Sequence, residues 1–148
     1  KLEALLLPEL GSGATFRPVP GLALEHAALG ASQSAFTSAD LAFAKLAADS
    51  GAGIAFERFA APEAEMWSGA GLLVEGPANI GRLVSGPNSW KWHPVATGSS
   101  SDEQMGWTVG EAVISTPDGH AGPSKYLTIW RRQRDGSVRY ITDGGNGR

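Results

Sequence analysis

Apolar and polar residues alternate most regularly between residues 90 and 143, where most of the tryptophans and both tyrosines also lie. A period of two places successive side chains on opposite faces, which is typical of strands with one buried face. Turn-forming residues divide this stretch into segments, and Asp135-Gly136 favours a tight hairpin between the last two. The pattern therefore predicts a curved antiparallel sheet with strands at 91–97, 105–116, 124–133 and 138–143, followed by a frayed tail.

The first half of the chain has a helical period instead. Apolar residues at helical spacing predict a helix over 39–49, with a stripe made of Leu41, Phe43, Ala44, Ala47 and Ala48. Ser38 is predicted to cap this helix, and Asp40 to interact with the positive end of its dipole. Two further helices are predicted at 53–60 and 76–86, and two short strands at 64–67 and 72–74.

Strands that are segregated from helices favour an α+β domain over a parallel α/β sheet. A chain of 148 residues is long enough for one domain with a real core. We expect residues 38–148 to form that domain and residues 1–37 to be an N-terminal extension.

The extension contains a short internal similarity. Phe16-Arg17-Pro18-Val19 lies 76 positions before Trp92-His93-Pro94-Val95. Residues 1–36 are therefore either a degenerate partial copy of 79–112 or a chance similarity in a chain rich in alanine, glycine and proline. A partial copy is expected to add strands to the main sheet or to the sheet of another subunit.

Composition excludes several classes of protein. The apolar content of 42% and charged content of 18% fit a soluble globular domain, and the net charge of −3 argues against nucleic-acid binding. The absence of cysteine excludes disulfides and thiolate chemistry. No apolar run reaches the ~20 residues of a membrane span, so we expect no membrane association. The localisation is expected to be either cytoplasmic or exported after removal of a signal peptide.

Five segments in order resemble the NTF2-like superfamily, and within it the SnoaL-like and DUF4440 type of small bacterial domain, which is related to ketosteroid isomerase. Together they span roughly residues 38–145. The most specific is KYLTIWRRQRDGSVRYITDGG at 125–145, and the others are ADLAFAKLAADSGAGIAFERFAAPEAEMW, VEGPANIGRLV, WKWHPVA and QMGWTVGEAVI.

The resemblance implies a cone, in which a strongly bent antiparallel sheet packs on about three helices and a pocket opens between them. It also implies a homodimer formed through the convex face of the sheet. Functions in this superfamily range from isomerases, cyclases and dehydratases to non-catalytic binding of a ligand or partner, so the fold leaves the function open.

The isomerases of this superfamily place a carboxylate base just after the second helix. Here that position falls near Trp67-Ser68, where no acid stands, and Glu65 comes two or three residues too early. Glu111 is a second candidate, because a carboxylate among apolar groups on a concave face would act as an acid or base. If that face is convex, Glu111 is instead solvated or paired with an arginine.

Two other residues are candidates for chemistry. His93 is either a proton shuttle or a structural or surface residue between Trp92 and Pro94. Asp143, at a position where the family often has Asp, either orients a pocket group or caps the turn amides near Gly144. No His-x-His or His-x-x-x-His spacing occurs, so neither a metal nor a cofactor is expected.

Aromatic residues at strand and helix spacing either line an apolar pocket or fill the core and a dimer interface. The candidates for the pocket are Phe43, Phe59, Trp67, Trp92, Trp107, Tyr126 and Trp130. The favoured hypothesis is a domain that binds an apolar small molecule without assigned catalysis. The alternatives are an isomerase, cyclase or hydratase that uses Glu111 or Glu65, and a dimerisation module.

Overall fold

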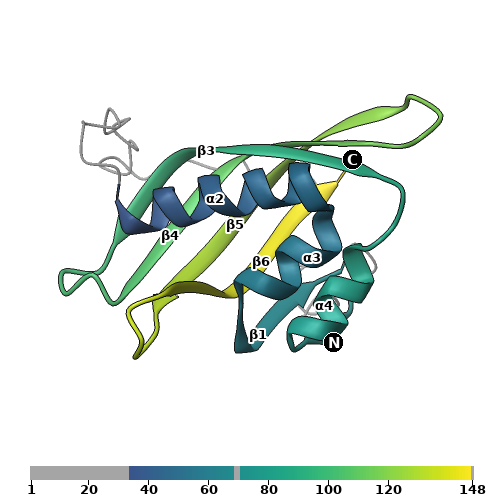
Figure 1. Ribbon diagram of the computed structural model, residues 1–148. Coiled ribbons are helices and arrows are strands. Elements are labelled where there is room, and N and C mark those ends of the chain that lie inside the picture. Colours follow the sequence, from purple (N-terminus) through teal and green to yellow (C-terminus); the bar gives the residue numbers. More distant parts are fainter. Residues whose placement is uncertain (1–33, 69–70, 148) are drawn as a thin grey trace, which may run out of the picture.

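The computed structural model describes residues 34–68 and 71–147 and contains three helices and six strands in that part of the chain (Figure 1). In chain order these elements are α2 (Ala35–Ser50), α3 (Ala52–Phe59), β1 (Ala60–Trp67), β2 (Leu73–Glu75), α4 (Pro77–Val84), β3 (Ser89–Ser99), β4 (Met105–Ser115), β5 (Ala121–Arg132) and β6 (Val138–Gly147).

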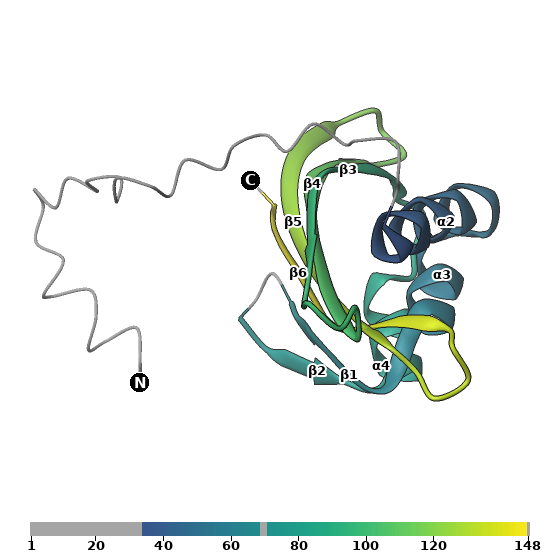
Figure 2. The same ribbon diagram turned by 90° about the vertical axis from the view of Figure 1, so that its left-hand side faces the viewer.

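The strands form one sheet in the order β2-β1-β6-β5-β4-β3. The sheet is strongly bent, and the three helices cover its concave face (Figure 2). All neighbouring strands are antiparallel except β1 and β6, which run parallel. The α+β prediction is confirmed, but the sheet is mixed rather than wholly antiparallel.

Several predicted boundaries are wrong, and β1, for example, begins at Ala60 rather than at residue 64. The helix α2 begins at Ala35 rather than after Ser38, because Ser34 accepts the Thr37 backbone N–H at 3.1 Å and supplies the N-cap. The strand β6 does not fray after Asp143 but continues to Gly147, because its backbone still pairs with β5 there. Glycine side chains contribute nothing to the hydrophobic pattern, so the pattern did not reveal this extension of the ladder.

The alternation along β4 decides which side chains reach the core. Its even-numbered residues face the helices, and its odd-numbered residues face outward. Gly106 allows α2 to approach closely, since a Cβ there would lie 2.3 Å from the Phe36 ring. The largest fully buried side chains are Trp130, Tyr140, Phe36, Phe43 and Ile80.

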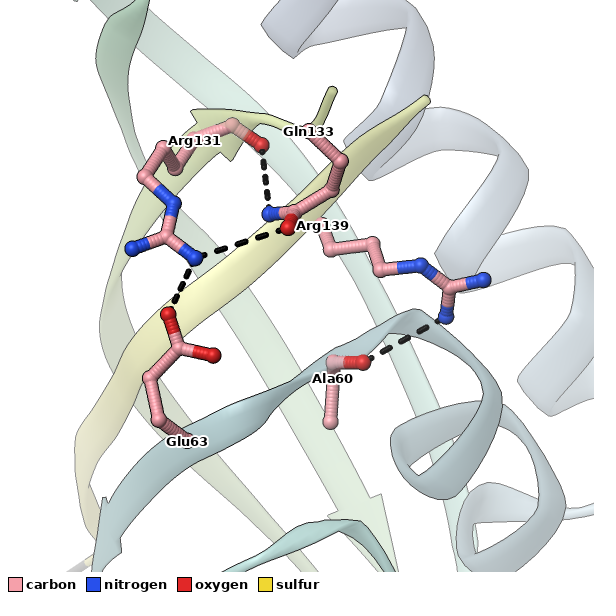
Figure 3. Close-up of polar contacts among 5 residues, drawn as sticks. All are labelled: Ala60, Glu63, Arg131, Gln133 and Arg139. Atoms are coloured by element: carbon pink, nitrogen blue, oxygen red, sulfur yellow. Dashed lines mark hydrogen bonds and ion pairs between the residues drawn. The ribbon is translucent and has the colours of Figure 1, made fainter. Parts of the chain in front are cut away.

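Arginines stabilise the place where α3 leads into the sheet. The carbonyls in the last turn of α3 have no partner within the helix, and the pairing of β1 with β6 shifts register between Ala60 and Glu65, so backbone carbonyls here need other donors. Arg139 donates to the carbonyls of Arg58, at 2.7 Å, and Ala60, at 3.4 Å. Figure 3 shows the bond to Ala60 and the ion pair of Arg131 with Glu63. Part of the basic charge near the C-terminus therefore serves contacts within the domain.

The N-terminal extension and its partial repeat fall almost entirely on residues 1–33, which lie outside the described residues, so both stay predictions. Within residues 34–68 and 71–147, no helix combines the length and apolar character that crossing a membrane requires.

Candidate functional site

A cavity of about 310 Å³ lies between the concave face of the sheet and the helices. Most of its wall is aromatic or aliphatic, and a few polar groups also line it. The lining residues are Phe43, Phe56, Met66, Trp67, Ser68, Leu83, Val84, Trp90, Trp92, Ala112, Ile114, Ser124, Tyr126, Thr128, Asp143 and Gly145. Such an apolar cavity with few polar groups is the usual form of a small-molecule site.

The strand period places these groups on one wall. Trp90 and Trp92 alternate along β3, as Tyr126 and Thr128 do along β5, so both pairs face the helices. Ala112 has a short side chain at the same level of β4, where a larger residue would occupy the space. The cavity therefore depends on a small residue, Ala112, beside the large side chains that line the rest of this wall.

A buried carboxylate supports this wall from behind. Asp40, in the second turn of α2, is fully buried and accepts hydrogen bonds from Trp92 Nε1 at 2.8 Å and the Tyr126 hydroxyl at 2.9 Å. Burial raises the pKa of Asp40, while hydrogen bonds from Thr108, Trp92 and Tyr126 act in the opposite direction. These bonds hold both rings in the cavity wall.

Gly110 makes room for this arrangement. A Cβ at Gly110 would lie 2.5 Å from the Tyr126 hydroxyl oxygen and 2.2 Å from the His93 carbonyl oxygen. The glycine therefore allows the Tyr126 phenol to cross the strand and reach Asp40.

A second buried carboxylate belongs to the cavity itself. Asp143 of β6 accepts a hydrogen bond from Thr128 Oγ1 at 2.6 Å, and its other oxygen receives no hydrogen bond from the described residues. Burial raises the pKa of Asp143 to about 7; the Thr128 bond lowers it and the Asp40 carboxylate raises it. Asp143 is therefore a group that changes charge near neutral pH inside an apolar cavity.

The tyrosines nearby stay protonated. Burial is the largest cause that raises the pKa of Tyr126, followed by the Asp40 charge, and burial and the Asp143 charge raise the pKa of Tyr140. Both phenols therefore act as hydrogen-bond donors, Tyr126 to Asp40 and Tyr140 to the Phe56 carbonyl at 2.7 Å.

The indole nitrogen of Trp90 is buried without a hydrogen-bond partner among the described residues, and its ring packs against Phe56.

The predicted pocket residues divide into two groups. Phe43, Trp67, Trp92 and Tyr126 line the cavity. Trp107 does not, because it lies on the outer face of β4, against Gly98. Phe59 and Trp130 pack around Phe43 in the core without lining the cavity.

The predicted catalytic candidates separate in the same way, and only Asp143 lies in the cavity wall. Glu111 is exposed on the outer face opposite His93 of β3, which is also exposed. Glu65 lies on β1, opposite Glu75 of β2 and Thr142 of β6 in the sheet register, and does not line the cavity. No group of three or more metal-ligating side chains occurs among residues 34–68 and 71–147.

Asp40 has another role than the one predicted, since its carboxylate supports the cavity wall from the second turn of α2 instead of interacting with the dipole at the start of a helix. One signal pointed to it: Phe36, Asp40, Phe43 and Ala47 follow each other at helical spacing, and all four are buried. An acid inside an apolar stripe has to find donors in the core, because a buried charge without partners is costly.

A scan against protein-family models finds no match, and a search of curated proteins finds no relative. Solved structures do match. A domain of unknown function with a cystatin-like fold from Nostoc punctiforme has 13% identity and a TM-score of 0.63, and the match covers 78% of this chain and 76% of that chain. The Δ5-3-ketosteroid isomerase of Mycobacterium sp. has 17% identity and a TM-score of 0.60, with 77% and 93% covered.

The chain has the NTF2-like fold. A third NTF2-like structure, a Mycobacterium tuberculosis protein in complex with estradiol-17β-hemisuccinate, has 12% identity and a TM-score of 0.58. That match covers 76% of this chain and 93% of the other. At such identities the shared property is the fold, and the chemistry of the cavity has to be argued from its own residues.

Proposed function

We propose that this NTF2-like protein binds an apolar small molecule in the cavity. The observation that carries the proposal is an aromatic cavity of about 310 Å³ that the packing of Asp40 against Trp92 and Tyr126 holds open. The Mycobacterium tuberculosis protein solved with an estradiol derivative has the same fold, which adds support.

A matched pair of variants tests this proposal. Ala112→Trp fills the cavity, whereas Val113→Trp adds the same side chain to the adjacent residue on the outer face. Indane, a small bicyclic hydrocarbon, is the probe. We expect saturating indane to raise the melting temperature of the wild type and of Val113→Trp, because a ligand that binds only the folded state stabilises it. The melting temperature of Ala112→Trp is expected not to respond.

The readout is the shift caused by indane relative to each variant's own melting temperature, so a loss of stability from overpacking does not affect it. Saturation-transfer NMR with indane gives a second measure of binding. Equal shifts in all three proteins, or none in the wild type by either method, would contradict the proposal.

Acid–base catalysis is a second candidate function, and Asp143 is the observation that favours it. A carboxyl group with a pKa of about 7 in an apolar cavity is suited to proton transfer at neutral pH. In this role Asp143 replaces Glu111 and Glu65, which lie outside the cavity. If it acts as a base, the protein should catalyse the exchange of the α-protons of 1-indanone for deuterium, and this catalysis should increase with rising pH around 7. The catalysis should be absent in Asp143→Asn, and equal exchange rates with both proteins would contradict it.

We also propose that the outer face of the sheet forms a homodimer. Met105, Val113 and Leu127 are between 41% and 45% exposed on this face, which is more apolar surface than strands that face water usually carry. Two structures with the same fold are described as a CaMKII hub and a CaMKII association domain.

A further inference from the structure

The cavity holds negative charge without a balancing positive charge. Asp143 lies in its wall, and Asp40 lies directly behind Trp92 and Tyr126. Among the described residues that line the cavity, none is a lysine, arginine or histidine. The groups that donate to the two carboxylates are indole and hydroxyl groups, which carry no charge.

An unbalanced carboxylate in an apolar site is costly, and a bound cation removes that cost. The two acids also repel each other, since the Asp40 charge makes ionisation of Asp143 harder. The other titratable groups near Asp143 are Tyr126 and Tyr140, both of which stay neutral. The nearby charges therefore favour a positive group on the ligand.

The aromatic wall favours the same kind of group. Six rings line the cavity, from Phe43, Phe56, Trp67, Trp90, Trp92 and Tyr126. The faces of such rings attract cations, and tryptophan does so most strongly. The same rings give an apolar ligand skeleton a surface to pack against.

We infer that the ligand is an apolar amine, whose protonated nitrogen pairs with Asp143 while its hydrocarbon part packs against the aromatic wall. This inference rests on the proposed binding function and narrows it to one chemical class. A neutral alcohol would satisfy the free oxygen of Asp143 but would leave its charge unbalanced. A carboxylate ligand would add a third negative charge to the same site.

Three probes of one shape separate these classes: 2-aminoindane is a cation, 2-indanol a neutral donor, and indane lacks polar groups. We expect 2-aminoindane to bind the wild type at pH 8 about ten-fold more tightly than 2-indanol. A difference of this size is what pairing of the ammonium group with the Asp143 carboxylate should produce. Isothermal titration calorimetry or NMR titration measures both affinities. In Asp143→Asn the preference for the amine should fall to within about two-fold.

The matched control is Glu111→Gln, which removes a carboxylate from the outer face of the sheet. It should keep the full preference for the amine. A preference caused by the general negative charge of the protein would instead fall equally in both variants, and that result would overturn the inference.

Proton release gives a second readout that uses only the wild type. The amine binds ionised Asp143, so at pH 7 binding should expel about half a proton per ligand, because the carboxyl group is about half protonated at its pKa. Calorimetry in two buffers with different ionisation enthalpies measures this release. The affinity for 2-aminoindane should fall as the pH is lowered from 8 to 6, where the amine itself stays charged.

The possible results separate the two proposals. If indane and 2-indanol bind as tightly as 2-aminoindane, and no proton is released, the cavity binds apolar molecules but the inference of an amine is wrong. If none of the three probes binds, the proposed function and the inference both fail. Tight amine binding that persists in Asp143→Asn would place the amine elsewhere and also overturn the inference.

Discussion

The two buried aspartates show how neighbouring residues give one side chain type different roles. Asp40 accepts hydrogen bonds from Trp92 and Tyr126 and holds the cavity wall in place. Asp143 has Thr128 as its side-chain donor and faces the cavity, so its charge is less well compensated. The cavity wall therefore combines a supporting acid with an acid that is available to a ligand.

Asp143 should make the protein less stable as the pH rises. Its folded-state pKa of about 7 lies above the ordinary 3.8, so between these values the folded state holds a proton that the unfolded state has lost. The contribution of Asp143 to stability should therefore be greatest below about pH 4, fall as the pH rises to 7 and level off above it. A rise of about 3 pKa units corresponds to at most about 4 kcal/mol.

Urea unfolding between pH 5 and 8 measures this effect. Asp143→Asn keeps an oxygen that accepts the Thr128 hydroxyl but cannot ionise, so the variant should exceed the wild type in stability by a margin that grows from pH 5 to 7 and is largest at pH 8. Parallel curves for the two proteins across this range would show that Asp143 does not carry the dependence.

At the scale of the elements, helix packing and the start of α2 depend on small or polar residues. The helices α3 and α4 meet at Gly53 and Gly81, where a Cβ on either residue would lie 2.9 Å from the other residue's carbonyl oxygen. At the N-terminus of α2, Ser34 contacts both the Thr37 backbone and, at 3.2 Å, the Thr97 hydroxyl of β3. These contacts determine how closely the helices approach each other and the sheet.

Two serines in the same segment provide a test of the helix cap. Ser34→Ala should lower the free energy of unfolding by about 1 kcal/mol, because it removes the acceptor for the Thr37 N–H. Ser38→Ala, at an exposed position within the helix, should change it by less than about 0.5 kcal/mol. Thermal or urea unfolding measures both variants, and a larger loss in Ser38→Ala would restore the sequence-based assignment of the cap.

At the scale of the whole molecule, the bend of the sheet separates two surfaces with different roles. The concave face and the helices enclose the cavity, and the convex face stays uncovered by them (Figure 2). The proposed ligand site and the proposed dimer interface therefore lie on opposite sides of the same strands.

The dimer can be tested without disturbing the cavity. Leu127→Arg places a charge on the exposed outer face of β5, whereas Leu41→Arg places one at a similarly exposed position on α2. Light scattering after size-exclusion chromatography should give twice the chain's mass for the wild type and for Leu41→Arg, and the single mass for Leu127→Arg. A wild type with the single mass would contradict a dimer. If Leu127→Arg is still a dimer, the interface does not lie on this face.

The order and type of these elements could be predicted from the sequence, because apolar periods of two and of about 3.6 residues depend only on local backbone geometry. The same periods also show which residues share a face: Trp107 with Glu111, and Thr108 with Gly110. Local patterns could not reveal which of the two faces of β4 turns toward the helices. Both faces carry apolar residues, and the choice depends on close approaches such as that of Phe36 to Gly106.

The residues of the candidate site also include some that the sequence predicts and some that only the tertiary structure identifies. Sequence reasoning named Asp143 and four of the aromatic residues that line the cavity, since strand spacing and the family resemblance pointed to them. Only the tertiary structure shows that Glu111 and Trp107 lie on the outer face. It alone also shows that Asp40 lies behind Tyr126, which is 86 residues further along the chain. A hydrogen bond between residues so far apart in the sequence leaves no local pattern, because Asp40 and Tyr126 meet only when α2 packs on the sheet.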